Sequence, residues 1–293
     1  MQKVGIFVHP RWEAAHALAR ELEINLRQQV AEVWIAPAWE EDSYSQQLPG
    51  SELLICVGGD GTMLWAARTV CPAEIPILGV NMGRLGFLAE IRPREALEKL
   101  PLVLKGAYRI EERTMLEARL SGAERSYIAL NDIIVGRASV GRPVYLEASV
   151  DAHRLALYRA DAVIVATATG STAYSFSAGG PILYPESREL LLTPVAPHLM
   201  PARSLVLPAD ARVEIKVVSD HAAVLSADGQ DDRSLSPGET ITVNRSPHLA
   251  RFVRLSEAGH HYSQLAERLG WLHVVDVSSS HYRLEGDEAD PDA

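Results

Sequence analysis

The chain has 293 residues, of which 47% are hydrophobic, 23% charged and 6% aromatic, a balance typical of a folded globular protein rather than a disordered or fibrous one. A formal net charge of −10 argues against broad nucleic-acid binding, which needs a basic surface to neutralise phosphates. Because single hydrophobic cores usually stop growing at about 250 to 300 residues, two domains are expected.

The first hundred residues alternate between short apolar runs and helical periodicity. Strands are expected at residues 4–8, 33–35, 53–57 and 77–80, and helices at 63–68 and 93–100, the last with proline at its start. Between the first two strands, apolar residues recur at three- and four-residue spacing on one helical face: Ala15, Leu18, Ala19, Leu22 and Leu26. This half is therefore predicted to be a Rossmann-like α/β domain with a mostly parallel sheet.

From about Tyr108 the pattern changes to short β runs separated by turn residues. Strands are expected at residues 115–120, 127–135, 144–150, 155–158, 162–166, 213–218, 222–226, 241–244 and 252–255, with a turn at Gly238-Glu239. Residues 263–269 look helical again, and the acidic tail has little to bury. The predicted organisation is an α/β domain at 1–107, a predominantly β domain at 108–258, a C-terminal helix and strand segment at 259–284 that returns to the first domain, and a disordered tail at 285–293.

Cysteine usage and hydropathy indicate the compartment. The chain has only Cys56 and Cys71, too few for a disulfide framework, which favours a reducing environment. The apolar run at the N-terminus is too short for a signal peptide, and no later segment offers roughly 18 uninterrupted apolar residues. We therefore expect a cytoplasmic protein with neither a membrane nor a nucleic acid as partner.

The strongest local signal is Gly58-Gly59-Asp60-Gly61-Thr62, between a buried strand and a helix. Glycines let the backbone bend tightly and approach a phosphate, whose charge is met by backbone N–H groups and the positive end of the helix. A carboxylate beside polyphosphate needs a reason, so Asp60 is interpreted as a metal partner or as a base for an attacking hydroxyl. A simple helix-capping turn is the alternative.

Two other segments suit a nucleoside ligand. Residues 167–181 follow an apolar strand and hold five serine and threonine hydroxyls between Thr167 and Ser175, a composition that could line a ligand channel. Within the apolar run 127–135, Asn131 can pair with a base edge and Asp132 can accept ribose hydroxyls. By itself this pair could equally be a bulge or a capped turn.

Together with residues 79–88, 112–116, 193–198, 228–230 and 269–271, these motifs resemble the NAD kinase family in order and spacing over nearly the whole chain. The glycine loop is shared with diacylglycerol kinase-like and phosphofructokinase-like enzymes, whereas the Gly-Ser-Thr-Ala-Tyr block at 170–174 with Asn131-Asp132 is more specific. The resemblance implies transfer of a phosphoryl group from ATP or another donor to the 2′-hydroxyl of the adenosine ribose of NAD, giving NADP. It also implies Mg²⁺ carried by the nucleotide and a homodimer or homotetramer.

Carried over by position, the resemblance implies that Asp60 is the proton acceptor and that Asn131 and Asp132 hold the adenosine of NAD. Asp161 would contact the nicotinamide end. The phosphate loop would be Gly58, Gly59 and Thr62, and the further ligand-binding positions would be Gly61, Arg142, Arg159, Thr172, Ala173, Tyr174, Ser175, Phe176, Ser177 and Gln230. No residue is expected to form a metal site of the protein's own.

The sequence departs from the family pattern at three positions. Trp65 stands where many relatives have a basic residue near the phosphates, Ala168 replaces a proline, and Ala162 replaces a glycine. Two rival functions stay open at this stage: a diacylglycerol kinase-like lipid kinase, which would need an apolar entrance, and a dinucleotide-binding sensor without phosphoryl transfer.

Overall fold

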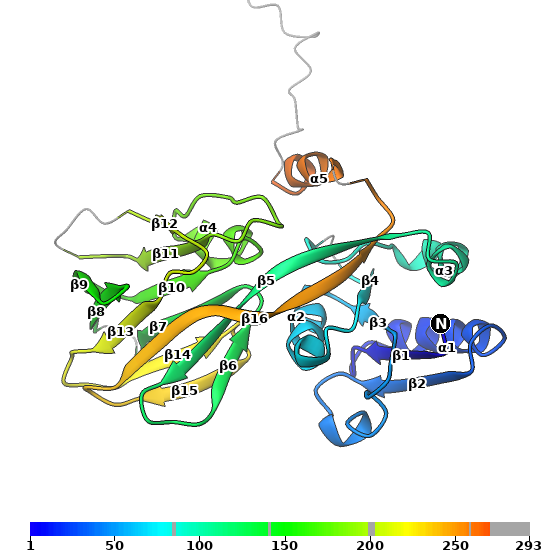
Figure 1. The fold of residues 1–293 in the computed structure, drawn as a ribbon, viewed down its shortest axis with the longest axis horizontal. Helices are drawn as coiled ribbons and strands as arrows, with labels where there is room; N and C mark the ends of the chain where they lie inside the picture. Colours follow the sequence, from blue (N-terminus) through cyan, green and yellow to red (C-terminus); the bar gives the residue numbers. More distant parts are fainter. Residues whose placement is uncertain (84–85, 140–141, 199–202, 258, 270–293) are drawn as a thin grey trace, which may run out of the picture. The chain divides into compact units, whose positions relative to one another are not determined.

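The structure is a computed structural model that describes residues 1–83, 86–139, 142–198, 203–257 and 259–269 (Figure 1). The chain forms two compact units, Met1–Leu255 and Ser256–Ala293, and the described part of the second holds helix α5 (His260–Arg268). This helix was expected at residues 263–269. The predicted strand segment and the predicted disordered tail, which lie at residues 270–293, fall outside the described residues.

The N-terminal part of the first unit is a parallel sheet with helices on both faces. Strands β1 (Lys3–Val8), β2 (Glu32–Pro37), β3 (Leu53–Gly58) and β4 (Ile77–Asn81) pair in the order β2-β1-β3-β4. Alternate strand residues pack against α1 (Glu13–Leu26) and α3 (Ala96–Leu104), and those between them pack against α2 (Asp60–Val70). Short 3-10 helices lie at Glu41–Ser43, Cys71–Ala73 and Pro93–Glu95. The predicted α/β fold of this part is confirmed.

The same sheet continues into antiparallel strands through β16 (Thr240–Arg254). This strand pairs in parallel with β4 at Phe252 and Ile77, and antiparallel with β5 (Arg109–Leu120) and β13 (Val213–Val217). Beyond these strands lie β6 (Ser126–Ala129), β8 (Val144–Val150) and β9 (His153–Ala160). One long strand therefore joins the α/β part to the β part.

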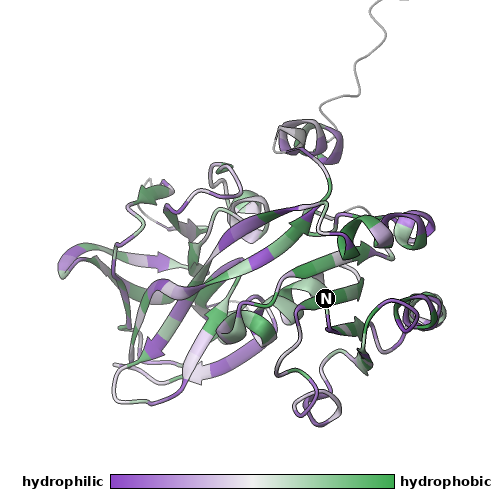
Figure 2. Cartoon of the chain, turned by 45° about the vertical axis from the view of Figure 1, so that its right-hand side comes forward, coloured by the Kyte–Doolittle hydropathy of each residue, from purple (hydrophilic) through white to green (hydrophobic). Residues whose placement is uncertain are grey.

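A second, antiparallel sheet covers the β part of the first. Its order is β12 (Leu205–Leu207), β11 (Leu190–Val195), β10 (Ala162–Ala166), β7 (Asp132–Arg137), β14 (Ala223–Ala227) and β15 (Asp231–Leu235). Inward-facing residues of both sheets form one core, as alternation along half-buried strands requires. Figure 2 shows hydrophobic and hydrophilic residues following one another along several of these strands. The predominantly β architecture was predicted correctly.

Several boundaries differ from the sequence prediction. The run at 127–135 is two strands, β6 and β7, because the chain turns at Leu130 and Asn131. The strands expected at 241–244 and 252–255 are one strand, β16, whose register against β5 shifts between Arg245 and Leu249 and so accommodates Pro247. Strands β11, β12 and β15 were missed, since β11 contains Pro194, β12 is short and β15 is strongly polar.

Candidate functional site

The glycine loop lies at the carboxyl edge of the parallel sheet, where the strand order reverses between β1 and β3. Ligands of doubly wound sheets bind at such a point. Gly59 is the N-cap of α2, and Asp60 is the first residue of this helix, so the backbone N–H groups and the positive end of the helix dipole face the loop. A Cβ atom at Gly58 would overlap the side chain of Thr62, which explains the need for glycine there.

The carboxylate of Asp60 is half-buried and fixed by the loop that follows β4. It accepts hydrogen bonds from the backbone N–H groups of Phe87 at 2.8 Å and Leu88 at 3.4 Å. An ionised carboxylate offers about four acceptor positions, so Asp60 retains capacity for a ligand hydroxyl. The loop therefore holds this group in place without exhausting it.

Gly86 completes the seat of Asp60, since a Cβ atom at position 86 would overlap the Asp60 carboxylate. We expect Gly86→Ala to displace this carboxylate and to lower kcat by about 10²-fold, the effect of a misplacement of roughly 1 Å at a reacting centre. Gly259→Ala is the matched control, because nothing lies within 4 Å of a Cβ atom there. Equal steady-state rates for the two variants would show that the close packing of Gly86 is irrelevant.

The Asn131-Asp132 turn is held by a carboxylate from the β14–β15 hairpin. The Asp228 carboxylate accepts hydrogen bonds from the backbone N–H groups of Asn131 at 2.7 Å, Leu130 at 2.9 Å and Asp132 at 3.1 Å. The φ angles of Asp228 and Gly229 are +53° and +63°, so the hairpin turns through the left-handed region that glycine adopts without strain. Asp228 is therefore a positioning residue for the turn predicted to bind adenosine.

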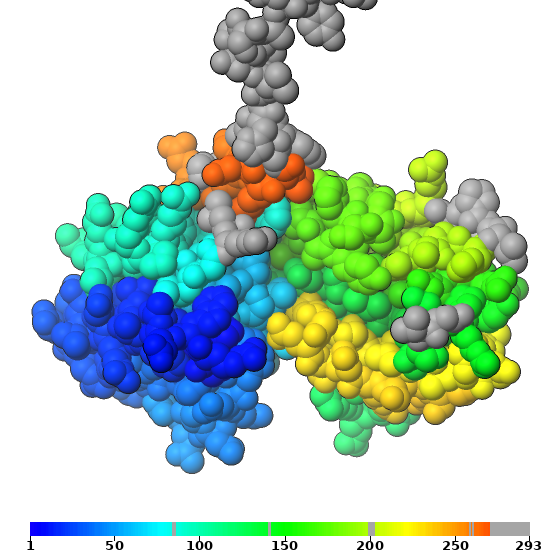
Figure 3. Space-filling view, turned by 180° about the vertical axis from the view of Figure 1, so that it is seen from behind, coloured from blue at the N-terminus to red at the C-terminus, as the bar shows by residue number. Residues whose placement is uncertain are grey.

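The same hairpin is tied to the helix of the glycine loop. The Arg68 guanidinium donates to the carbonyl of Ala227 at 3.1 Å and to Gln230 Oε1 at 2.7 Å, and its Nε lies 3.8 Å from Asp228 Oδ2. The Gln230 amide in turn donates to the Gly61 carbonyl at 2.9 Å. In the space-filling view the cyan residues that include α2 lie between the blue N-terminal residues and the green and yellow β part (Figure 3). Hydrogen bonds thus connect the phosphate loop to the predicted adenosine site.

Sequence reasoning gave no role to Arg68 and noted Asp228 only as part of a matching segment. Their partners lie far away along the chain, so no local spacing reports these contacts. The one usable signal was Asp228-Gly229, a dipeptide typical of hairpin turns.

Asp132 is a buried carboxyl, with only 4% of the residue exposed. Burial, and then the negative charge of Asp228, raise the pKa of Asp132 to about 7. Burial also raises the pKa of Asp228, although the three N–H groups and Arg68 act in the opposite direction. Asp132 therefore titrates near neutral pH, as functional carboxyl groups often do.

The hydroxyl-rich segment only partly matches its predicted role. Four of its hydroxyl groups are buried and bonded within the protein: Thr167 to the Leu130 carbonyl, Thr169 to Arg113, Ser171 to the Ala168 carbonyl and Ser175 to Thr193. These four hydroxyl groups are thus already used inside the protein, and the role of the segment in lining a ligand channel stays a prediction. Side chains open to solvent remain at Thr172, Tyr174, Phe176 and Ser177, on a 3-10 turn (Gly170–Thr172) and on α4 (Tyr174–Ser177).

This segment nevertheless adjoins the Asn131 turn. Thr167 donates its backbone N–H to the Asn131 carbonyl at 2.9 Å, and a Cβ atom at Gly170 would overlap the same peptide group. The predicted residues Asp60, Gly61, Asn131, Asp132 and Gln230 are thus brought together with the loop that carries residues 172–177.

Arg159 and Asp161 lie elsewhere. In the β7–β10 pair, Ala166 faces Asp132 while Ala162 faces Gly136 at the opposite end, roughly 13 Å away at the usual strand rise. Asp161 directly precedes Ala162 and forms an ion pair with Arg137 at 3.2 Å. Arg142, exposed before β8, also falls outside the network around Asp60. The structure therefore does not bring the arginines and Asp161 to the glycine loop.

The three departures from the family pattern fit their surroundings. Trp65 is 8% exposed and packs edge-on against Phe7, so it replaces a charged side chain by a core aromatic. Ala162 pairs across the sheet with Gly136, and a Cβ atom placed on Gly136 would lie 3.0 Å from the Cβ atom of Ala162. Ala168 is buried.

Further features bear on the class of protein. Both cysteines are free and buried. Among the described residues, no group of three His, Cys, Asp or Glu side chains could hold a metal ion. No helix of the described part of the chain is long and apolar enough to cross a membrane.

Comparison with known proteins gives consistent matches over both parts of the chain. Residues 2–108 match the ATP-NAD kinase N-terminal domain, and residues 130–255 match the ATP-NAD kinase C-terminal domain. The NAD kinase of Dehalococcoides mccartyi strain CBDB1 is 39% identical over 92% of this chain and 96% of its own, and that of Symbiobacterium thermophilum is 47% identical over 75% and 76%.

Two solved structures share the fold. Yeast NADH kinase complexed with NADH superimposes with a TM-score of 0.78 at 26% identity, covering 94% of this chain and 89% of its own. An NAD kinase from Archaeoglobus fulgidus in complex with ATP superimposes with a TM-score of 0.71 at 25% identity, covering 92% and 99%.

Proposed function

The chain belongs to the NAD kinase family of phosphotransferases, and we propose that it transfers the γ-phosphoryl group of a donor such as ATP to the 2′-hydroxyl of the adenosine ribose of NAD. The observation that carries this proposal is the fixed Asp60 carboxylate beside the glycine loop, joined through Gln230 and Asp228 to the Asn131-Asp132 turn. The groups proposed as proton acceptor, phosphate cradle and nucleoside site thus belong to one hydrogen-bonded unit, which supports the proposal.

In the proposed reaction, the Asn131-Asp132 turn holds the adenosine so that its 2′-hydroxyl faces Asp60. Asp60 accepts the hydroxyl proton while the ribose oxygen bonds to the γ-phosphorus and the bond to the bridging oxygen of the donor breaks. Backbone N–H groups at the start of α2 position the phosphates. Positioning and charge stabilisation supply most of the rate, and no covalent enzyme intermediate is needed.

A divalent cation belongs to this reaction as part of the nucleotide. The donor phosphates would hold Mg²⁺, which leaves the half-buried Asp60 carboxylate to accept the hydroxyl proton. Oxygen ligands suit Mg²⁺, which usually binds through one or two carboxylates and substrate phosphates. When bound, the ion neutralises charge on the phosphates.

The test is to mix the purified protein with NAD, ATP and Mg²⁺ and to assay NADP, with inorganic triphosphate and diacylglycerol as alternative donor and acceptor. NADP formation is expected. Tight NAD binding without any phosphoryl transfer would favour the sensor instead, and a phosphorylated lipid would favour the lipid kinase. Since Trp65 packs as a buried aromatic against Phe7, the lack of a basic side chain at this position does not by itself favour the sensor.

The raised pKa of Asp132 gives a prediction for NAD binding. An ionised Asp132 accepts a ribose hydroxyl more strongly than a protonated one, so we expect the KM for NAD to fall as pH rises through about 7. Asp132→Asn should flatten this dependence between pH 6 and 8 and raise KM at pH 8. The measurement is the KM for NAD at constant ionic strength. An unchanged pH profile in the variant would remove Asp132 from the ribose contact.

The remaining assignments extend this proposal. Free, buried thiols support operation in the reducing cytoplasm. Asp161 is proposed to contact the nicotinamide end of NAD, and Arg142 and Arg159 are proposed as further ligand-binding residues. Assembly into two or four copies is proposed from the family resemblance.

A further inference from the structure

Trp39, at the carboxyl end of β2, combines two unusual features. Its φ angle is +66°, a conformation that is strained for a bulky residue. Its indole is also 43% exposed, although burial would favour folding. Strained residues that persist in a native structure cluster at functional sites. Neither the family motifs nor the proposed mechanism uses Trp39.

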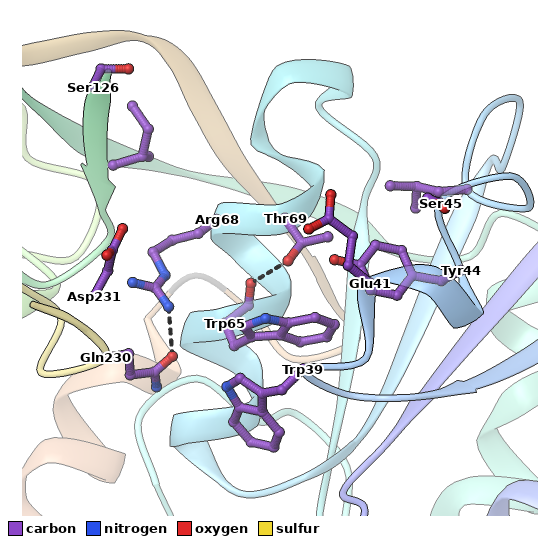
Figure 4. Close-up of a pocket in the computed structure, with 12 residues that line it drawn as sticks. Trp39, Glu41, Tyr44, Ser45, Trp65, Arg68, Thr69, Ser126, Gln230 and Asp231 are labelled. Carbon is purple, nitrogen blue, oxygen red and sulfur yellow. Dashed lines mark hydrogen bonds between the residues drawn. The ribbon is translucent and has the colours of Figure 1, made fainter. Parts of the chain in front are cut away.

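The indole of Trp39 faces a cavity of about 610 Å³ beside α2 (Figure 4). Aromatic rings form one side of the cavity: the Trp39 and Trp65 ring centroids are 5.6 Å apart, and those of Trp65 and Tyr44 are 5.5 Å apart. Polar groups complete the lining, among them Ser45, Thr69, Ser126 and Gln230. A volume of this size and a mixed lining of aromatic and polar groups are typical of small-molecule sites.

The charges of the cavity select a neutral occupant. Glu41 contributes a carboxylate, the Asp231 carboxylate is paired with Arg125 at 2.8 Å, and the guanidinium of Arg68 already donates to Ala227 and Gln230. A chain of phosphates placed here would meet the Glu41 carboxylate, while the guanidinium groups of Arg68 and Arg125 already have partners. A purine base suits the site, because every base has a face that stacks on aromatic rings and edges that hydrogen-bond to polar side chains.

The cavity is joined directly to the phosphate loop. Gln230 lines it and donates to the Gly61 carbonyl, and Trp65 and Thr69 lie four and eight residues after Gly61 on the same helix, roughly 6 and 12 Å along its axis. The ribose and phosphates of a nucleoside triphosphate can bridge this separation. The adenosine of NAD has its own proposed site at Asn131 and Asp132.

We propose that the Trp39 cavity binds the base of the phosphoryl donor, so that this enzyme selects a nucleoside triphosphate over inorganic polyphosphate. The inference rests on the proposed phosphoryl transfer and adds to it the site and class of donor. In this proposal Trp39 contributes to binding of the donor. A substitution of Trp39 should therefore change the KM for the donor and leave proton transfer at Asp60 unchanged.

The test compares Trp39→Gly and Trp39→Phe with the parent protein, using ATP and inorganic triphosphate as donors and NADP as product. Trp39→Gly removes the ring and relieves the backbone strain at the cost of its packing on Trp65, so Tm is measured alongside the kinetics; we expect the KM for ATP to rise about tenfold, the range expected for one lost stack. The KM values for triphosphate and NAD should not change. Trp39→Phe should retain most of the affinity for ATP.

Each other outcome overturns the inference in a recognisable way. Equal KM values for ATP and triphosphate in the parent protein would show that no base is bound. A higher KM for NAD in Trp39→Gly would assign the cavity to the acceptor, and a lower Tm with unchanged kinetics would make Trp39 structural. Leu102→Ala, at a 47% exposed position on α3, controls for loss of a surface apolar group. Absence of NADP with every donor would instead refute the proposed function itself.

Discussion

Asp60→Asn should lower kcat about 10²-fold or more while the KM for NAD stays near that of the parent protein, because the change removes a general base and leaves the adenosine site intact. The amide oxygen of asparagine can still accept one of the two N–H groups from Phe87 and Leu88, so most of the loop should stay in place. What the amide cannot do is take up the proton of the attacking hydroxyl.

Steady-state kinetics combined with calorimetric titration of NAD would check this result. Asp210→Asn is a suitable control, since Asp210 is an exposed carboxylate in a turn outside the site. A variant at position 60 with near-normal turnover would reject Asp60 as the proton acceptor. Loss of NAD binding together with turnover would instead point to a collapsed loop.

Glu111→Ala is expected to have the largest effect on stability. Glu111 on β5 accepts from Arg113 at 2.6 Å and from Arg254 at 2.8 Å, and all three residues are at most 6% exposed. Removing the carboxylate would leave the buried Arg113 without this ion pair and Arg254 with only the longer pair to Glu90 at 3.5 Å, which costs about 3–5 kcal/mol. In a chain of this size we expect Tm to fall by about 10 °C.

A matched pair on the same strand provides the control. Glu117 and Arg119 are also two residues apart on β5 and lie 2.8 Å from each other, but the Arg119 side chain is 62% exposed. Glu117→Ala should therefore cost at most about 1 kcal/mol. Similar Tm losses in Glu111→Ala and Glu117→Ala, measured by scanning calorimetry, would refute the special role of the buried cluster.

The same carboxylate gives a dependence of stability on pH. Burial by itself would raise the pKa of Glu111, but Arg254 and Arg113 outweigh it and lower the pKa to about 2. Because the pKa is lower in the folded state, the stabilisation is present above the ordinary pKa near 4.5 and is lost as pH falls from there towards 2. Glu111→Gln should reduce the loss of Tm in this range. An equally steep loss in the variant would assign it to other carboxyl groups.

The architecture was predictable because its signals are local. Buried parallel strands appear as continuous apolar runs, and the change to short β runs after Tyr108 marks the second architecture. Strand β16 was divided in two because polar residues interrupt its middle, where β5 supplies the missing partners at a shifted register. Asp60 could be singled out because a carboxylate within a glycine loop is chemically conspicuous.

The interactions around the site were less accessible to sequence reasoning. Asp228 and Arg68 act on residues that only the folded chain brings near. The hydroxyl-rich segment shows a different difficulty. Composition reveals that a segment can form hydrogen bonds, but not whether its hydroxyl groups bond to a ligand or to the protein itself. Ser171 and Ser175 use theirs inside the protein. Trp39 gave no sequence signal, because neither its backbone angle nor its neighbours follow from the pattern.

The position of β16 has a consequence for how the chain folds during synthesis. The free edge of β4 is covered near Ile77 by Phe252, a residue that the ribosome adds only after nearly all of the chain has emerged. Until then the nascent α/β part has an open strand edge, the kind of surface on which other chains can associate. Folding of the α/β part is therefore complete only when the last strand of the β part has been made. A chain released from the ribosome before Arg254 would keep the edge of β4 uncovered.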